Sequence, residues 1–234
     1  MTVLTVDVGT SVIKSVVFDA EGREVAVSRT GTEVLRPHPG WAEQDMDAVW
    51  RGVVSTVRGA LAQLGPGHDA VRLIAFTAQG DGCWLVDGDG RPTGPAILWS
   101  DGRAGDLLAR WQAEGVLAEA YRRNGSLTCA GMPNAVLTWL AEHDPARLER
   151  SHTALTAAGW LFLRLTGVTA IDASDASAPS STTPRARTTP RSWTCSAWRG
   201  PVGCCRASSD TTSASPSSPT TRQPNWALPP VFPS

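Results

Sequence analysis

Long apolar runs are missing from the sequence, and none reaches the roughly 20 residues that a transmembrane helix needs. The chain leads directly into a strand pattern, without the basic segment and cleavage site of a secretory signal. We therefore expect a cytoplasmic protein that does not contact a membrane.

Paired cysteine spacings and basic patches are also missing. The five cysteines show no metal-ligand spacing, so we expect unligated thiols rather than a zinc site. The four histidines occupy unrelated positions, and we assign none of them a role. Residues 1–178 hold 15 Arg or Lys against 21 Asp or Glu, which makes nucleic acid a poor candidate partner.

Residues 179–234 differ in composition from the rest of the chain. In this stretch 30 of 56 residues are Ser, Thr or Pro, and only four are Leu, Ile, Val or Phe. Such a segment cannot bury enough apolar surface to offset its chain entropy. We expect one ordered but incomplete domain over residues 1–178 and a disordered tail over residues 179–234.

Residues 1–178 alternate between strand and helix patterns. Apolar and β-branched runs predict strands, the first three forming an antiparallel meander, over residues 3–6, 12–18, 24–28, 73–76 and 83–86. Apolar residues at helical spacing and a proline at a helix start predict helices over about 45–64, 104–120, 133–142 and 154–165. The pattern indicates an α/β fold with a mixed sheet.

The turn Asp7-Val8-Gly9-Thr10-Ser11 between the first two strands could carry chemistry. A glycine there lets backbone N–H groups approach a phosphate, and Thr10 and Ser11 add hydroxyl groups. A carboxylate at a strand end, here Asp7, can hold a metal ion or its water. Lys14, the only lysine in the chain, follows closely. The alternative is a plain hairpin with a glycine turn.

A second polar segment, Gln79-Gly80-Asp81-Gly82, follows the strand 73–76. Ligands of open α/β sheets bind outside the carboxyl ends of strands. The amide of Gln79 and the carboxylate of Asp81 suit a polyhydroxylated ligand, whose hydroxyl groups need both donors and acceptors. The alternative is a polar loop with two glycines that serve only the turn.

A third segment ends an apolar run with Trp99-Ser100-Asp101-Gly102-Arg103. An aromatic face beside a carboxylate and a guanidinium can form the floor of a sugar site. The alternative places Trp99 in the core and makes Asp101 a helix N-cap.

Together these segments resemble the N-terminal domain of the FGGY carbohydrate kinases. The resemblance rests on the ordered segments 7–11, 40–45 (Gly-Trp-Ala-Glu-Gln-Asp), 79–82, 96–103 and 165–177. It implies an actin-like, ribonuclease H-like ATPase fold, and phosphorylation of a sugar or polyol hydroxyl with ATP and Mg²⁺.

The resemblance also implies roles for individual residues. Asp7 would lie near Mg²⁺. Lys14 is assigned to nucleotide binding as well, because it follows the turn closely in the sequence. Gly9, Thr10 and Ser11 would contact the ATP phosphates. The residues that would face the substrate are Gln79, Asp81, Trp99 and Asp101.

Within the family, Gln-Gly-Asp-Gly followed by Trp is most similar to erythritol kinases. We therefore expect a four- or five-carbon alditol as substrate, with a ketopentose such as xylulose second. The general-base aspartate of the family would lie beyond the end of the resemblance, so no catalytic residue is assigned here.

The resemblance stops at residues 178–179, and the genetic code suggests why. GC-rich codons for Ser180–Pro184, regrouped one base earlier, read Phe-Leu-Asp-Asp-Pro. The same shift turns Thr188–Gly200 into Tyr-Asp-Pro-Glu-Val-Leu-Asp-Leu-Leu-Gly-Leu-Ala-Gly. Both resemble the segments that follow in the family. We therefore interpret the tail as an out-of-frame translation; the alternative is a natural Ser/Thr/Pro-rich tail.

Three functions from different classes remain possible. The chain is the N-terminal fragment of a polyol kinase, inactive alone, or a non-catalytic sugar-binding or regulatory module. The third is an actin-like assembly protein, for which the phosphate turn alone would suffice. Segments 79–82 and 99–103 favour a function that involves sugar.

Overall fold

The computed structural model describes residues 1–65, 70–172, 175, 192–195 and 205–208. Its strands are β1 (Thr2–Val8), β2 (Val12–Phe18), β3 (Glu24–Gly31), β4 (Glu43–Gln44), β5 (Val71–Ala78), β6 (Trp84–Val86), β7 (Ala96–Ile97), β8 (Thr153–Leu155), β9 (Ser192–Cys195) and β10 (Cys205–Ser208). Its helices are α1 (Met46–Leu61), α2 (Gly105–Ala113), α3 (Val116–Asn124), α4 (Pro133–His143), α5 (Pro145–Arg150) and α6 (Ala157–Thr166).

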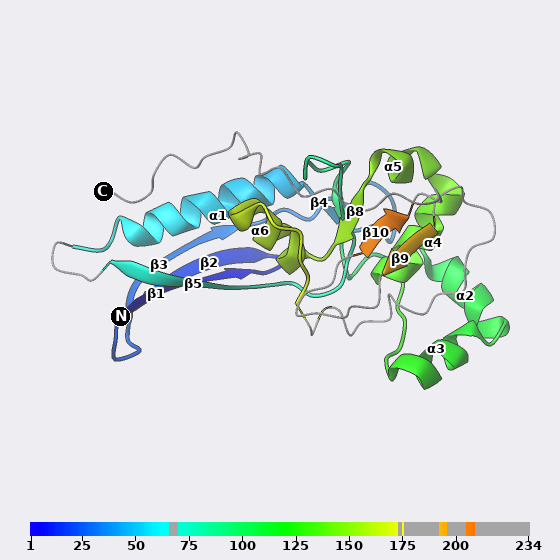
Figure 1. Ribbon diagram of the computed structural model, residues 1–234, viewed down its shortest axis with the longest axis horizontal. Coiled ribbons are helices and arrows are strands. Elements are labelled where there is room, and N and C mark those ends of the chain that lie inside the picture. The colour runs from blue at the N-terminus through cyan, green and yellow to red at the C-terminus, as the bar shows by residue number, and fades with distance from the viewer. Residues whose placement is uncertain (66–69, 173–174, 176–191, 196–204, 209–234) are drawn as a thin grey trace, which may run out of the picture.

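The main sheet has the strand order β3-β2-β1-β5. Strands β1, β2 and β3 form the predicted antiparallel meander. Strand β5 pairs with β1 in parallel, with Asp7 beside Thr77 and Val8 beside Ala78. The predicted mixed α/β sheet is therefore confirmed, and the carboxyl ends of β1 and β5 lie side by side (Figure 1).

Helix α1 covers one face of this sheet (Figure 1). Alternate residues of β1, namely Leu4, Val6 and Val8, are buried in the same core as α1. A buried hydrogen bond of 2.8 Å from Ser15 to Thr56 also joins β2 to the helix. Because side chains alternate along a strand, Asp7 belongs to the opposite face of the sheet.

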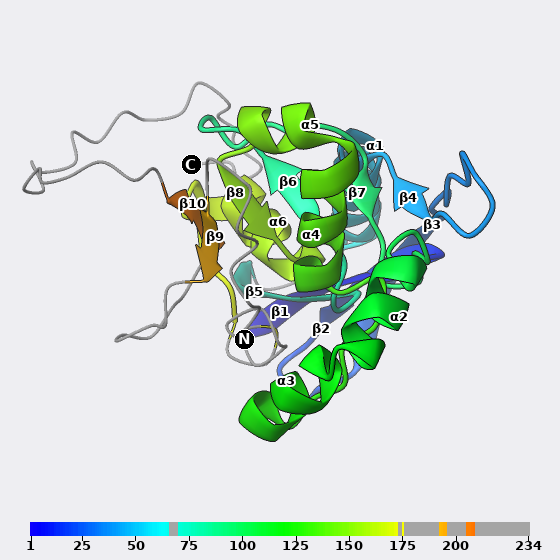
Figure 2. The same cartoon turned by 90° about the vertical axis from the view of Figure 1, so that its right-hand side faces the viewer.

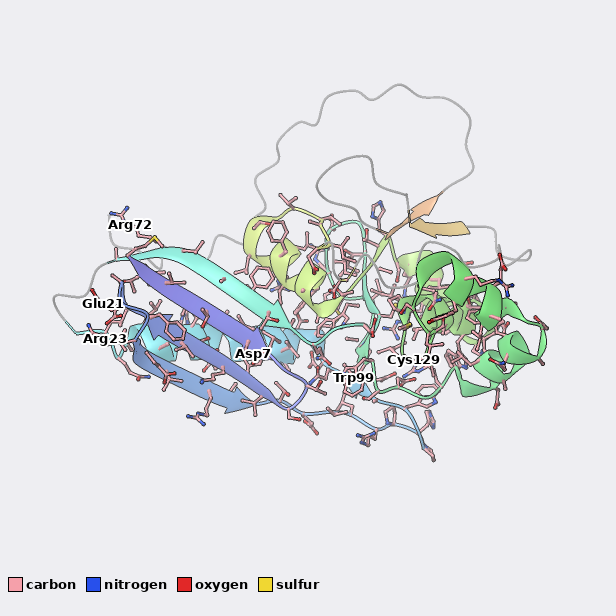
Figure 3. The ribbon with its side chains drawn as sticks, turned by 90° about the horizontal axis from the view of Figure 1, so that it is seen from below. Asp7, Glu21, Arg23, Arg72, Trp99 and Cys129 are labelled. Carbon is pink, nitrogen blue, oxygen red and sulfur yellow. The ribbon has the colours of Figure 1, made fainter. Side chains whose placement is uncertain are left out.

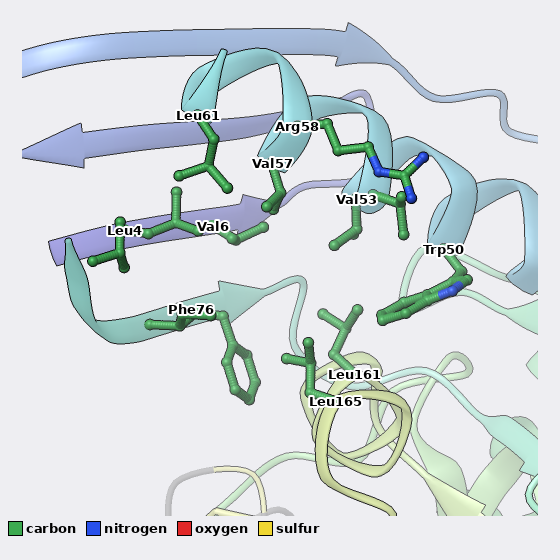
Figure 4. A pocket seen from close by; sticks show the side chains of 13 residues that line it. Leu4, Val6, Trp50, Val53, Val57, Arg58, Leu61, Phe76, Leu161 and Leu165 are labelled. Carbon is green, nitrogen blue, oxygen red and sulfur yellow. The ribbon is translucent and has the colours of Figure 1, made fainter. Parts of the chain in front are cut away.

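An apolar cavity of about 120 Å³ lies between α1, the main sheet and α6 (Figure 4). Leu4, Val6, Trp50, Phe76 and Leu161 are among its lining residues, and Arg58 supplies the charged group. The cavity contains none of the polar side chains predicted to bind ligand, so it is not a candidate sugar site.

The other half of the molecule contains two smaller sheets and most of the helices. Strands β6, β8, β10 and β9 form one small sheet, and β4 pairs with β7. Figure 2 shows α4 and α5 above α2 and α3 at this end of the molecule. The rings of Trp84 and Trp160 pack against each other at a tilt, with their centroids 5.3 Å apart, and place β6 and α6 in one core with the main sheet.

Two of the predicted helices differ from the structure. The helix predicted over 104–120 is two helices, because Gly115 adopts a left-handed φ of 75° that interrupts the first and precedes the second. The helix predicted from residue 154 begins only at Ala157. Thr156 caps it by accepting a hydrogen bond from Gly159, and the three residues before Thr156 form β8.

The tail predicted to be disordered contains two described strands, β9 and β10. Strand β10 pairs with β8 and so satisfies backbone groups along one edge of that short strand. Eight residues of the tail are thus described as strands. The remainder of the tail lies outside the described residues, so a disordered tail stays a prediction. None of the helices in the described part of the chain has the length and apolarity that crossing a membrane requires.

Candidate functional site

The turn after β1 is held tightly by its own backbone. Gly9 N donates to Val12 O at 3.0 Å, and a Cβ atom at Gly9 would lie 3.0 Å from the same oxygen. The Thr32 hydroxyl donates to Thr10 O at 2.6 Å, and Thr32 N donates to Ser11 O at 2.9 Å. These bonds fix the backbone of the predicted phosphate turn.

Asp7 and Lys14 differ in how they relate to this turn. The exposed Asp7 lies near the carboxyl end of β1, which points toward the half of the molecule that contains Trp99 (Figure 3). Lys14 lies opposite Asp7 in register, but its Nζ is 3.9 Å from Glu24 Oε2. Because Glu24 pairs with Phe18 at the other end of the hairpin, the ammonium group is directed away from the turn.

The loop after β5 lies directly beside the phosphate turn. Gln79 N donates to Val8 O at 2.9 Å, which extends the parallel pairing to the end of both strands. The Thr10 hydroxyl donates to Gln79 Oε1 at 3.0 Å. The structure therefore brings together two of the segments that the sequence singled out.

Trp99 joins the third segment to the same point. Its indole Nε1 donates to Thr10 Oγ1 at 3.1 Å, although half of the Trp99 side chain is exposed. The core alternative for Trp99 is thus wrong. An indole that offers one face and uses its N–H to fix its position can serve as a floor for a sugar.

Gln44 completes the hydrogen bonding of this group, and sequence reasoning did not single it out. Its Nε2 donates to Thr10 O at 2.9 Å, and its Oε1 accepts from Gln79 Nε2 at 2.7 Å. Gln44 is buried in β4, which pairs with β7 just before Trp99. Its place in the segment 40–45, already part of the resemblance, was the available signal.

Asp81 occupies an unusual backbone position. Its φ of 50° is the only left-handed value at a non-glycine residue in the described part of the chain. Such a conformation costs roughly 1–2 kcal/mol in most residues. Glycine would adopt it more easily, so the presence of a carboxylate there supports a use for that group.

The surroundings of Asp81 favour its protonated form. Burial raises the pKa of the Asp81 carboxyl above its ordinary value of 3.8. Burial also raises the pKa of the Asp175 carboxyl, and the negative charges of Asp172 and Asp81 raise it further. A hydrogen bond with Thr156 lowers the same pKa in part. Asp81 and Asp175 are thus close enough to repel each other when both are ionised.

Two glycines allow the chain to pack against the backbone of the Trp99 segment. Gly82 has a φ of 74°, and a Cβ atom there would lie 2.8 Å from Ile97 O. A Cβ atom at Gly131 would lie only 2.1 Å from Trp99 O. Gly82 N also donates to Gly131 O at 3.1 Å, so these close approaches fix the position of Trp99. Sequence reasoning did not identify Gly131.

Asp101 has a different environment from the one expected for a substrate ligand. Its carboxylate is buried and accepts hydrogen bonds from Arg103 Nε at 2.8 Å, Arg103 N at 2.9 Å and Ala42 N at 2.6 Å. Arg103 also bonds Glu43 at 2.6 Å and lies 3.8 Å from the centre of the Trp41 ring. The structure thus places Asp101 in a buried ion pair beneath the site. Ala104, not Asp101, is the N-cap of α2.

The residues present fit a magnesium nucleotide. Within the described residues, no three His, Cys, Asp or Glu side chains converge on a possible metal position. Mg²⁺ bound with a nucleotide usually takes only one or two carboxylates, and keeps waters and phosphate oxygens as its other ligands. The exposed carboxylate of Asp7, next to a turn in which a Cβ atom at Gly9 would fit only tightly, meets that requirement.

Comparisons with known proteins agree with this geometry. A model of the FGGY family of carbohydrate kinases, N-terminal domain, matches residues 2–183. The chain is 36% identical over 174 residues to L-xylulose/3-keto-L-gulonate kinase of Escherichia coli, covering 74% of this chain and 35% of that protein. It is 32% identical over 175 residues to erythritol kinase of Brucella abortus, and the match covers 75% of this chain and 34% of that protein.

A solved structure of xylulose kinase from Rhodospirillum rubrum has the same fold over this region. Its TM-score is 0.70 at 27% identity, and the match covers 74% of this chain and 35% of that one. The chain therefore spans about a third of the length of the relatives it matches.

Proposed function

Because the chain belongs to the FGGY family of carbohydrate kinases, we propose that it is the N-terminal part of an enzyme that phosphorylates a sugar or alditol hydroxyl with ATP. The observation that carries the proposal is the hydrogen bonding of Thr10 to both Gln79 and Trp99. It makes the phosphate turn and the two sugar-side segments a single site at the carboxyl end of the sheet.

The chemistry of the substrate side suits a polyhydroxylated molecule. Gln79 supplies an amide N–H, Asp81 supplies a carboxylate and Trp99 supplies a partly exposed ring. A hydroxyl group can donate to the carboxylate while its neighbour accepts from the amide. We therefore propose that Asp81 binds one or two hydroxyl groups of the substrate.

Two substrate classes have support, and we propose the alditol first. The segment Gln79–Gly82 followed by Trp resembles erythritol kinases, and an erythritol kinase is among the relatives. A ketopentose is the second candidate, because L-xylulose/3-keto-L-gulonate kinase is 36% identical to this chain.

The nucleotide side uses the turn after β1. We propose that backbone N–H groups around Gly9, together with Thr10 and Ser11, hold the ATP phosphates, and that Asp7 holds Mg²⁺ through its carboxylate or a water. Bound Mg²⁺ would supply charge neutralisation on the phosphates. Gly9→Val should weaken ATP use more than sugar binding, because the added side chain would meet Val12 O.

The test uses the gene with one base inserted after codon 179, so that the family reading frame continues. We expect the restored protein to phosphorylate erythritol, xylitol or L-xylulose with ATP, and Asp81→Ala to raise the KM for that substrate sharply. Each hydrogen bond to a charged acceptor is worth roughly 1.5–3 kcal/mol. If Asp81→Ala phosphorylates these substrates as well as the restored wild-type protein does, Asp81 has no role in substrate binding and belongs to an ordinary loop.

The same experiment separates the other functional classes. A sugar-binding or regulatory module would bind a sugar without ATP turnover. An assembly protein would hydrolyse ATP without any sugar requirement and would form polymers. Sugar-dependent consumption of ATP with one phosphorylated product supports the kinase.

A further inference from the structure

Gln44 lies between the two halves of the site, the turn that contains Thr10 and the loop that contains Gln79. It is almost fully buried, with 1% of its surface exposed. Its amide makes one hydrogen bond to each half: Nε2 donates to Thr10 O, and Oε1 accepts from Gln79 Nε2. The catalytic and binding roles proposed above do not require this residue, so its two bonds call for a separate explanation.

The direction of every bond in this group is fixed by its two ends. The Trp99 indole N–H can only donate, so Thr10 Oγ1 must accept from it and use its own hydrogen on Gln79 Oε1. At the other end, the backbone oxygen of Thr10 can only accept, so Gln44 must present its NH₂ group there. Inverting either amide would set oxygen against oxygen.

We propose that Gln44 is a positioning residue for substrate recognition, an inference that rests on the proposed kinase function. By accepting from Gln79, Gln44 holds that amide with its oxygen toward Thr10 and its NH₂ group toward the Gln44 side. One hydrogen of Gln79 Nε2 is used on Gln44, and the second is available as a donor to a substrate oxygen. With Asp81 as acceptor, the site then recognises a pair of hydroxyl groups in one orientation.

The Trp99 indole N–H reports on this arrangement without any ligand. Its resonance in the ¹⁵N-labelled 234-residue chain can be identified by its disappearance in Trp99→Phe. The indole bonds Thr10, and Gln44 bonds Thr10 both directly and by way of Gln79. A change at Gln44 should therefore reach the resonance. The wild-type chain titrated over the same pH range gives the baseline for the carboxyls of the site, Asp7 and Asp81.

Gln44→Glu is the decisive variant. A protonated glutamic acid can make both bonds of Gln44, because its O–H group can donate to Thr10 O and its carbonyl oxygen can accept from Gln79 Nε2. Its carboxylate cannot donate to Thr10 O. We expect the Trp99 resonance to move upfield when Glu at position 44 ionises and to return to its wild-type position at low pH. The midpoint should lie above the ordinary glutamate value of about 4.3.

Gln63→Glu is a matched control far from the site. Like Gln44, Gln63 both donates and accepts through its amide: Nε2 donates to Val27 O and Gly59 O at 2.7 and 2.9 Å, and Oε1 accepts from Val27 N at 3.3 Å. We expect no pH-dependent movement of the Trp99 resonance in this variant. Equal movement in both variants, or none in folded Gln44→Glu, would overturn the proposal.

A second variant decides the question if Gln44→Glu does not fold. In Gln79→Glu, at a half-buried position, the second carboxylate oxygen would face Gln44 Oε1 and favour protonation. We expect the pH midpoint of the Trp99 resonance shift to lie above the ordinary glutamate value in Gln79→Glu. Adding Gln44→Met should lower that midpoint. An unchanged midpoint in the double variant contradicts the positioning role.

The two proposals fail in distinguishable ways. These spectra need neither ATP nor sugar, so the positioning role of Gln44 can fail while the restored protein still turns over substrate. If the restored protein is folded and shows no turnover, the kinase proposal fails and the spectra describe only how the chain orders its own amides.

Discussion

The indole Nε1 of Trp99 donates a hydrogen bond of 3.1 Å to the hydroxyl of Thr10, a residue 89 positions earlier in the chain. Thr10 lies in the turn proposed to bind the ATP phosphates, and Trp99 lies in the segment proposed to bind sugar. The bond therefore connects the parts of the site that would hold the two reactants.

Replacing Thr10 by valine should lower stability. The Thr10 hydroxyl makes two side-chain hydrogen bonds, each contributing about 0.5–1.5 kcal/mol. We expect Thr10→Val to lose about 1–3 kcal/mol in urea unfolding, and Thr10→Ser to retain most of that. Thr5→Val, which removes one long bond of 3.3 Å from the preceding strand β1 to Val16 O, is the control. Equal losses of unfolding free energy in Thr10→Val and Thr5→Val would show that the two Thr10 hydrogen bonds stabilise the fold no more than the single Thr5 bond does.

Asp101 should affect stability rather than substrate binding. Removing one partner of a buried ion pair costs about 3–5 kcal/mol, because the other charge stays buried. We expect a loss of this order for Asp101→Asn and little change for Asp89→Asn, whose pair with Arg91 is exposed. A raised substrate KM in restored, fully folded Asp101→Asn would return this residue to the substrate site.

The contribution of Asp175 to the stability of the folded chain should fall as the pH rises above 3.8. Burial raises the pKa of this carboxyl, so the folded state binds the proton more tightly than the unfolded state. The associated stability is present below pH 3.8 and is lost as the pH rises through the raised pKa. Asp175→Asn should therefore gain stability over wild type toward pH 7, measured as unfolding midpoints.

Asp19 provides a control of opposite sign for that measurement. Hydrogen bonds from Arg23 hold the pKa of the Asp19 carboxyl below its ordinary value. Its contribution is present above pH 3.8 and is lost on acidification, so Asp19→Asn should be less stable than wild type at pH 7. The same direction of change in both variants would contradict the environments described here.

Gly131→Ala should displace Trp99. The added Cβ atom would lie 2.1 Å from Trp99 O, and overpacking of this kind costs about 1–3 kcal/mol. We expect lower stability together with a shifted Trp99 indole resonance. Gly105→Ala is the control, since no atom lies within 4 Å of its Cβ position. A folded Gly131→Ala chain with an unmoved Trp99 resonance would contradict the packing argument.

Local rules predicted the parts of the fold that depend on neighbouring residues. Apolar and β-branched runs identified the β1–β3 meander, and the rule for carboxyl ends of strands singled out Gln79 as a ligand candidate. That Gln79 lies beside the turn was known only from the structure. The split of the helix at Gly115 was missed, because helical spacing continues across a residue whose φ the sequence does not display.

Long-range partners explain what the sequence did not reveal in the site. Asp101 was expected to face substrate, but its carboxylate is occupied by Arg103 and by the backbone of Ala42, 59 residues away. Lys14 was placed with the turn by proximity in sequence, whereas Glu24 attracts its ammonium group. Gln44 carries no distinctive motif of its own, and only the fold brings it between Thr10 and Gln79.

The central claim is that this chain holds one half of a kinase site, and that the half alone does not turn over substrate. A general base contributes about 10²–10⁴ in rate, and holding both reactants in line contributes roughly 7–11 kcal/mol. The family resemblance implies that the general base and the second domain would lie beyond its end at residue 178.

The most direct measurement compares ATP-dependent phosphorylation of erythritol, xylitol and L-xylulose by two purified proteins, the 234-residue chain and its frame-restored counterpart. We predict turnover of at least one substrate by the restored protein and none above background by the 234-residue chain. Clear turnover by the short chain, or none by a folded restored protein, would contradict the account.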